Sequence, residues 1–263
     1  MVRIPIAIIN ASTLVEHQEI VDAAAALQVQ VSRDFAPFWN VDAQIAVVPP
    51  GALPPAGAWW VVALDNSDLG NALGYHDLTS EGLPIAKVFI ETSRQAGQDW
   101  TVLFSHEILE MLSDPYISLT ALVPTAQGML LYAYENCDAC QSDASGYKIG
   151  GRLVSDFCTP AWFDANKAGT SGPFDFRKLI TQPFELLAGG YAMLRNVSVG
   201  GAWTIVTAPA ATKASLAQAL RPRIGSRRER RKTGLGGWIK SNVEVGRDFS
   251  VADLTLPSVS SLL

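Results

Sequence analysis

The chain has 263 residues, of which 48% are hydrophobic and 17% are charged, so it carries enough apolar material for one large globular core, with or without an appendage. The net charge is −5, and the positive charge is concentrated in one short segment near the C-terminus. No apolar run approaches the roughly 20 residues that span a bilayer. Since the first residues also lack a signal-peptide pattern, we expect a cytoplasmic protein without membrane contact.

The first part of the chain alternates strand and helix patterns. An Ile-rich strand is expected at residues 3–9. A helix should begin near Thr13, because Thr13 and Glu16 have the spacing of a capping box. Further strands are expected at residues 43–48 and 59–64, with a Pro- and Gly-rich turn between them.

Residues 65–84 are rich in Asn, Asp and Gly and predict a loop, which carries His76. A strand is expected at 85–91, followed by a helix over 99–113. Asp114 and Pro115 should end that helix, because the residue before a proline disfavours helical backbone.

The second half predicts β-structure. We expect a strand at 129–136, one hairpin around Gly150-Gly151, and another around Gly200-Gly201. Short helical pieces are expected at 176–180 and 183–187. Together these patterns predict an α+β fold with a mixed sheet, in which residues 1–208 form the main domain and 209–263 a basic, partly flexible appendage.

The helix over 99–113 carries the strongest chemical signal. Leu103, Phe104 and Ile108 belong to an apolar surface that covers most of its circumference, which is typical of a buried helix. The same helix nevertheless carries His106, Glu107, Glu110 and, at its end, Asp114. His106 and Glu110 are four residues apart and share a face. A bound cation would offset the cost of burying such charges, and imidazole and carboxylate ligands suit Zn²⁺.

The segment His106-Glu107-Ile108-Leu109-Glu110 resembles the HExxH signature of zincin metallopeptidases, with Glu in place of the second His. The resemblance implies that His106 and Glu110 bind Zn²⁺ and that Glu107 is the general base for a metal-activated water. The order of elements before this helix also resembles a zincin half-domain, in which the preceding strand, here 85–91, forms one wall of the cleft. The alternative is a buried His106 that is hydrogen-bonded to one Glu, without a metal.

A catalytic zinc site needs a third protein ligand. Some zincins use a Glu well downstream of the helix, and Glu135 fits that spacing, so we predict Glu135 as the third ligand. The competing candidates are Asp114, Asp138, Asp156 and His76. His76 and Tyr134 are the candidates for assisting the developing oxyanion, and a turn-capping role for His76 remains equally open.

Cys137 and Cys140 have CxxC spacing, and Cys158 follows. A four-Cys zinc knuckle would need another pair, and a redox centre would need the motif at a helix start. We therefore expect buried cysteines near the active site, although a second metal site remains open.

The C-terminal region contains a concentrated basic run, whose residues are Arg221, Arg223, Arg227, Arg228, Arg230, Arg231 and Lys232. The run lacks the interleaved aromatic residues of a nucleic-acid platform, so it favours a solvated linker or an acidic partner. The final residues, 248–263, could dock on a partner protein as an extended peptide.

The sequence thus predicts a zinc-dependent hydrolase that acts on a peptide or protein substrate. The alternative is a catalytically inactive zincin-like protein that serves a structural or interaction role in a larger assembly.

Overall fold

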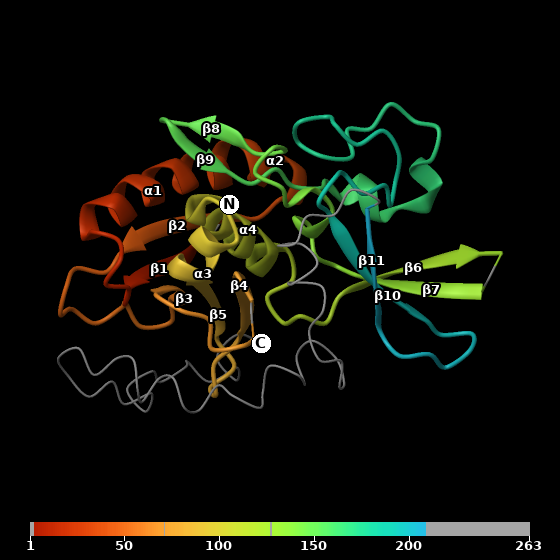
Figure 1. Cartoon of the computed structure of the whole chain (residues 1–263). Coiled ribbons are helices and arrows are strands. Elements are labelled where there is room, and N and C mark those ends of the chain that lie inside the picture. The colour runs from red at the N-terminus through yellow and green to blue at the C-terminus, as the bar shows by residue number, and fades with distance from the viewer. Residues whose placement is uncertain (1–2, 71, 127, 209–263) are drawn as a thin grey trace, which may run out of the picture.

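The computed structural model describes residues 3–70, 72–126 and 128–208, and its first half is built on one mixed sheet (Figure 1). The strand order is β2-β1-β3-β5-β4, and every neighbouring pair is parallel except β4 and β5, which are antiparallel. The strands are β1 (Arg3–Asn10), β2 (Asp42–Val47), β3 (Trp59–Leu64), β4 (Gly74–Leu78) and β5 (Pro84–Phe89).

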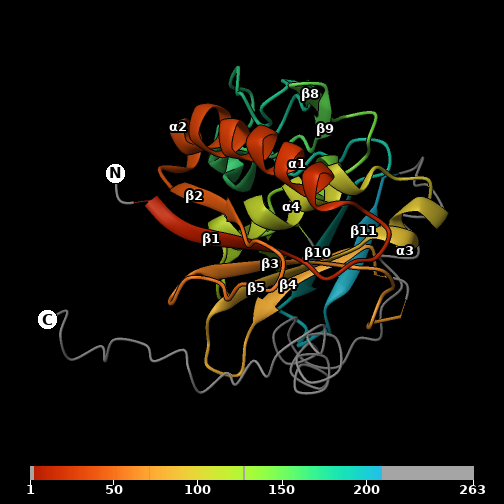
Figure 2. The ribbon, with the colours of Figure 1, turned by 90° about the vertical axis from the view of Figure 1, so that its left-hand side faces the viewer.

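The helices α1, α2 and α4 lie on one face of this sheet (Figure 2). The main core forms there, because alternate strand residues such as Ile6 and Ile8 point towards the helices, while Ala7 belongs to a cluster on the opposite face. The helices are α1 (His17–Val29), which continues through a π-helical turn (Gln30–Phe35) into α2 (Ala36–Trp39), then α3 (Ile90–Gln95) and α4 (Trp100–Ser113).

The second half adds an antiparallel sheet of order β11-β10-β7-β6 and a separate hairpin, β8–β9. Its strands are β6 (Thr120–Thr125), β7 (Gly128–Ala133), β8 (Tyr147–Ile149), β9 (Arg152–Val154), β10 (Tyr191–Asn196) and β11 (Thr204–Thr207). The chain is therefore α+β, and both expected hairpins are present. Among the described helices, none combines the length and apolarity needed to cross a bilayer.

Helix α1 begins later than the capping-box prediction. Glu16 is the N-cap, and its reciprocal partner is Glu19, whose side chain accepts a hydrogen bond from the Glu16 backbone N–H. Thr13 instead donates its backbone N–H and its hydroxyl to the carboxylate of Asp65. The capping-box spacing is therefore satisfied one turn further along the chain.

The prediction of a loop over 65–84 was wrong in its second part, because Gly74–Leu78 forms β4. This strand pairs with β5 and places His76 opposite Ala86. All five residues of this strand are buried. Neither of its faces is exposed to solvent, so its sequence does not show the alternation of apolar and polar residues that predicts a strand. Strand β4 is therefore an edge strand of the sheet, next to β5.

The two helical pieces expected at 176–180 and 183–187 are turns and irregular backbone. Lys178 and Phe184 have φ values of 60°, and a residue in the left-handed region interrupts a right-handed helix. The proposed appendage, 209–263, lies outside the described residues, together with its basic run and final segment.

Helix α4 begins at the N-cap Asp99, whose carboxylate accepts a hydrogen bond from the Thr101 backbone N–H. A buried polar network then fixes its middle. Ser105 Oγ donates to Gln30 Oε1 at 2.7 Å and accepts from the Ser155 backbone N–H at 3.0 Å. Gln30 Nε2 donates to the Ser155 carbonyl at 2.8 Å. The network joins α4, the π-helical turn and the segment after β9, directly beside His106.

Substitution Ser105→Ala would remove the hydrogen-bond partner of Gln30 Oε1 and of the Ser155 N–H, both of which are buried. We expect the free energy of unfolding to fall by about 1–3 kcal/mol for each group left without a partner. Urea unfolding of the variant measures this change. A loss below about 0.5 kcal/mol would show that the network does not hold α4 in place.

Candidate metal centre

Helix α4 carries three ionisable groups of the candidate site, His106, Glu107 and Glu110. Their side chains are 1%, 2% and 1% exposed. Because α4 packs between the sheet and the β8–β9 hairpin, this helix has almost no solvent-facing surface, and its polar groups must find partners inside the protein.

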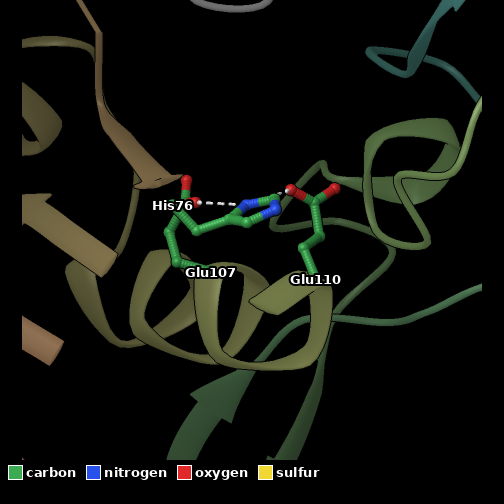
Figure 3. Close-up of side chains that lie close together, drawn as sticks. All are labelled: His76, Glu107 and Glu110. Atoms are coloured by element: carbon green, nitrogen blue, oxygen red, sulfur yellow. Dashed lines mark ion pairs between the residues drawn. The ribbon is translucent and has the colours of Figure 1, made fainter. Parts of the chain in front are cut away.

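Strand β4 brings His76 to the same place (Figure 3). His76 Nδ1 lies 3.6 Å from Glu107 Oε2 and 3.5 Å from Glu110 Oε2, and the imidazole is fully buried. The Nε2 atom on the other side of the ring lies 3.8 Å from Glu135 Oε2. The sequence-predicted residues His76, Glu107, Glu110 and Glu135 are therefore close together.

The segment that follows β7 completes the centre. Asp138, in the 3-10 helix η2 (Asp138–Cys140), places Oδ1 at 3.3 Å from His106 Nε2. Glu110 Oε1 lies 3.2 Å from the same imidazole nitrogen. The Cys137 backbone N–H donates to Glu110 Oε1 at 3.4 Å and so helps to orient this carboxylate.

Among the described residues, two sets of three have the geometry to hold a cation, and Glu110 belongs to both. One set is His106, Glu110 and Asp138, and the other is His76, Glu107 and Glu110. In each set the possible ligand atoms all lie within 4.8 Å of one another. Glu135, which the sequence favoured as the third ligand, belongs to neither set.

The charges of these groups are strongly coupled. Burial acts to lower the pKa of His106, but the negative charge of Glu110 and a hydrogen bond with Asp138 raise it well above its ordinary value. Burial acts to raise the pKa of Glu110, but His106 and His76 hold it well below its ordinary value. The raised pKa of His106 reflects the carboxylates around it, and the lowered pKa of Glu110 reflects the two imidazoles that it faces.

Two of the competing candidates have other roles. Asp114 caps the end of α4, and its carboxylate accepts the backbone N–H groups of Ser118 and Leu119 at 3.1 and 2.9 Å. Asp156 accepts the backbone N–H groups of Phe157 and Arg177 at 2.8 and 3.2 Å. Neither belongs to a set of converging ligand atoms among the described residues.

Tyr134 lies beside Glu135, and its ring contacts Phe163 and Trp39 with centroid separations of 4.0 and 5.5 Å. Burial, and then the charge of Asp114, raise the pKa of its hydroxyl. The tyrosine also lines a pocket of about 280 Å³ that reaches Glu135 and Asp114. A role for Tyr134 in stabilising an oxyanion stays a prediction.

The three cysteines are free and fully buried. Burial raises the pKa of Cys137, Cys140 and Cys158, so these groups are thiols rather than thiolates. Cys137 adjoins the centre through the hydrogen bond of its backbone N–H to Glu110, as expected for core cysteines near the site.

The sequence named Asp138 only as one of several competitors. The sequence feature that could have identified Asp138 is its position directly after Cys137, on the segment that also carries Glu135.

A second carboxyl, Asp175, was missed altogether. It is fully buried, hydrogen-bonds to Asp156, and accepts the backbone N–H groups of Leu179 and Ile180.

The Asp156–Asp175 pair predicts a stability that depends on pH. Burial, together with the hydrogen bond and charge of Asp175, raises the pKa of Asp156 to about 8, against 3.8 for an isolated carboxyl. The folded chain therefore binds one proton more than the unfolded chain between these values, and its stability should fall as pH rises, by up to about 1.4 kcal/mol per pH unit.

An Asp156→Asn variant can keep the hydrogen bond to Asp175 without ionising, so we expect it to lose most of this slope. Urea unfolding of both proteins between pH 5 and pH 8, in the presence of a chelator, measures the difference. Equal slopes in the two proteins would show that Asp156 is not the group that holds the extra proton.

Comparison with known proteins does not assign a function to this site. No protein-family model matches the chain, and no curated protein or solved structure matches it either. The chemistry of the centre therefore follows from its own residues.

Proposed function

We propose that the protein is a metal-dependent hydrolase whose cation is bound by His106, Glu110 and Asp138. The supporting observation is the convergence of these three buried side chains. Zinc bonds of about 2.1 Å in a tetrahedral arrangement place neighbouring ligand atoms about 3.4 Å apart. His106 Nε2 lies 3.2 Å from Glu110 Oε1 and 3.3 Å from Asp138 Oδ1, so the ligand atoms have the spacing that a cation such as Zn²⁺ requires.

In this proposal Asp138 replaces Glu135 as the third ligand. Glu135 lies against the far nitrogen of His76 instead, where a carboxylate can orient the imidazole. The set of one imidazole and two carboxylates is compatible with zinc. The element order and the HExxE helix support a zincin-like arrangement, with β4 as the strand beside the helix.

The cation would supply a water of lowered pKa and would polarise a substrate carbonyl. Glu107 directly follows the ligand His106, and its Oε2 atom accepts no hydrogen bond from the described residues. This oxygen is available to take a proton from the water, the role of a general base. His76 lies 3.6 Å from the same oxygen and would stabilise the developing oxyanion.

A pocket beside Glu135 offers a substrate one approach to this part of the molecule. Its wall is mainly apolar and includes Ile117, Leu119, Met193 and Trp203. A volume of about 280 Å³ suits a small group, such as one or two amino-acid side chains, rather than a large cofactor. These features support a substrate with a small apolar group, such as the side chain of a peptide.

Burial of the centre favours a second candidate function, in which the cation is purely structural. The side chains of His106, Glu110 and Asp138 are each at most 3% exposed, and structural zinc sites are closed to solvent whereas catalytic sites keep one open position. Activity and metal retention distinguish the two functions.

The variant Glu107→Gln should keep the cation of the first set and lose hydrolysis by about 10²–10⁴-fold, because the amide cannot accept the proton. Digestion of a peptide library, followed by mass spectrometry, measures the turnover. Glu91→Gln is the matched control, since Glu91 lies on α3 and, among the described residues, its side chain accepts a hydrogen bond only from Gln95. Equal turnover of Glu107→Gln and the wild type would remove Glu107 as the base.

Substitutions of the candidate ligands should show whether Asp138 or Glu135 is the third ligand. We expect His106→Ala and Asp138→Asn to lose the zinc ion of the first set, and Glu135→Gln to retain it, as measured by mass spectrometry of purified and reconstituted protein. His17→Ala, on α1, controls for the loss of a histidine. Loss of zinc in Glu135→Gln with retention in Asp138→Asn would reverse the assignment.

A further inference from the structure

The carboxylate of Glu110 faces two imidazoles at once. Its Oε1 atom lies 3.2 Å from His106 Nε2, and its Oε2 atom lies 3.5 Å from His76 Nδ1. Figure 3 shows His76 between the Glu107 and Glu110 carboxylates. A carboxylate in this position can bind one cation through each oxygen.

The second set of ligand atoms has metal-site spacing of its own. His76 Nδ1 lies 3.6 Å from Glu107 Oε2 and 3.5 Å from Glu110 Oε2. These separations exceed those of good N–H···O hydrogen bonds, about 2.7–3.2 Å, and are close to the roughly 3.4 Å between neighbouring ligands of a tetrahedral cation.

A second observation points to a ligand at this position. Glu107 is 2% exposed, and its Oε2 atom, which faces His76, has no hydrogen-bond partner among the described residues. Its other oxygen lies against β4, because a Cβ atom added at Gly74 would lie 2.7 Å from Glu107 Oε1. Burying an ionised oxygen without a hydrogen bond is unfavourable, and a cation would offset this cost.

Electrostatic balance also favours a second cation. The buried groups Glu107, Glu110, Glu135 and Asp138 carry four negative charges when ionised. One divalent cation neutralises half of that charge, whereas two neutralise all of it while both imidazoles remain neutral, the form in which histidine binds metals. Glu135 faces His76 Nε2 at 3.8 Å and is placed to orient this ring towards a cation at Nδ1.

We propose that His76, Glu107 and Glu110 form a second divalent-cation site, which shares Glu110 with the site of His106, Glu110 and Asp138. The inference rests on the proposed function for the first cation. Two cations that share one carboxylate lie about 3.5–4 Å apart. A cation in the second site occupies the Glu107 oxygen that would otherwise accept a proton, so excess zinc inhibits hydrolysis.

The competing arrangement contains no second cation. In it His76 is protonated and faces the charges of Glu107, Glu110 and Glu135. The two arrangements differ in how many cations the chain binds and in which substitutions reduce that number.

The test is equilibrium dialysis of the full, metal-free chain against increasing zinc, with metal counted by mass spectrometry. The wild type binds two zinc ions per chain. His76→Ala and Glu107→Gln each bind one. Glu110→Gln weakens both sites by at least 10-fold. His17→Ala and Glu91→Gln are the matched controls and bind two. Because Glu107→Gln is nearly isosteric, it carries the test if His76→Ala does not fold.

Turnover gives an independent readout. Zinc above one equivalent lowers hydrolysis by the wild type, whereas the His76→Ala variant loses this inhibition.

The outcomes separate the two proposals. A wild type that binds one zinc ion, lost in Asp138→Asn and kept in His76→Ala, overturns the second site and leaves the proposed function standing. Two zinc ions that are both retained by His76→Ala and Glu107→Gln also overturn it. A chain that binds no zinc overturns both proposals.

Discussion

The candidate metal centre depends above all on positive charge that offsets its buried carboxylates. Four carboxyl groups lie around two imidazoles in a region that solvent barely reaches. Removing a carboxylate from water costs several kcal/mol unless opposite charge and hydrogen bonds replace the lost hydration. Backbone donors serve Asp114 and Asp156 in this way, and the imidazoles of His76 and His106 lie within 3.8 Å of the other four carboxyl groups.

The rest of the fold places these groups. Helix α4 packs on strands β5 and β4, and the antiparallel edge strand β4 lies beside the helix at the level of Glu107. The Ser105 network fixes the opposite side of α4. The segment after β7 then brings Glu135 and Asp138 from the second sheet. The site thus forms where the two halves of the chain meet.

Much of this arrangement could be predicted from local patterns. The apolar helix and its end at Asp114-Pro115 followed from the sequence, and the spacing of His106 and Glu110 placed them on one face. Strand β4 was not predictable by alternation, because both of its faces are buried. The choice between Asp138 and Glu135 was not predictable either. They are three residues apart on one segment, and only tertiary packing decides that one faces His106 and the other His76.

The position of the centre has a consequence for the chain as a polymer. Its residues come from β4, α4 and the segment after β7, so a bound cation would act as a non-covalent cross-link between residues that are distant in sequence. Unlike a disulfide, such an ion leaves the chain on unfolding, so it stabilises the fold by its free energy of binding to the folded state. The three cysteines form no such bond. In this protein a bound, exchangeable ion would connect the two sheets. A chelator would remove that connection, as a reductant breaks a disulfide.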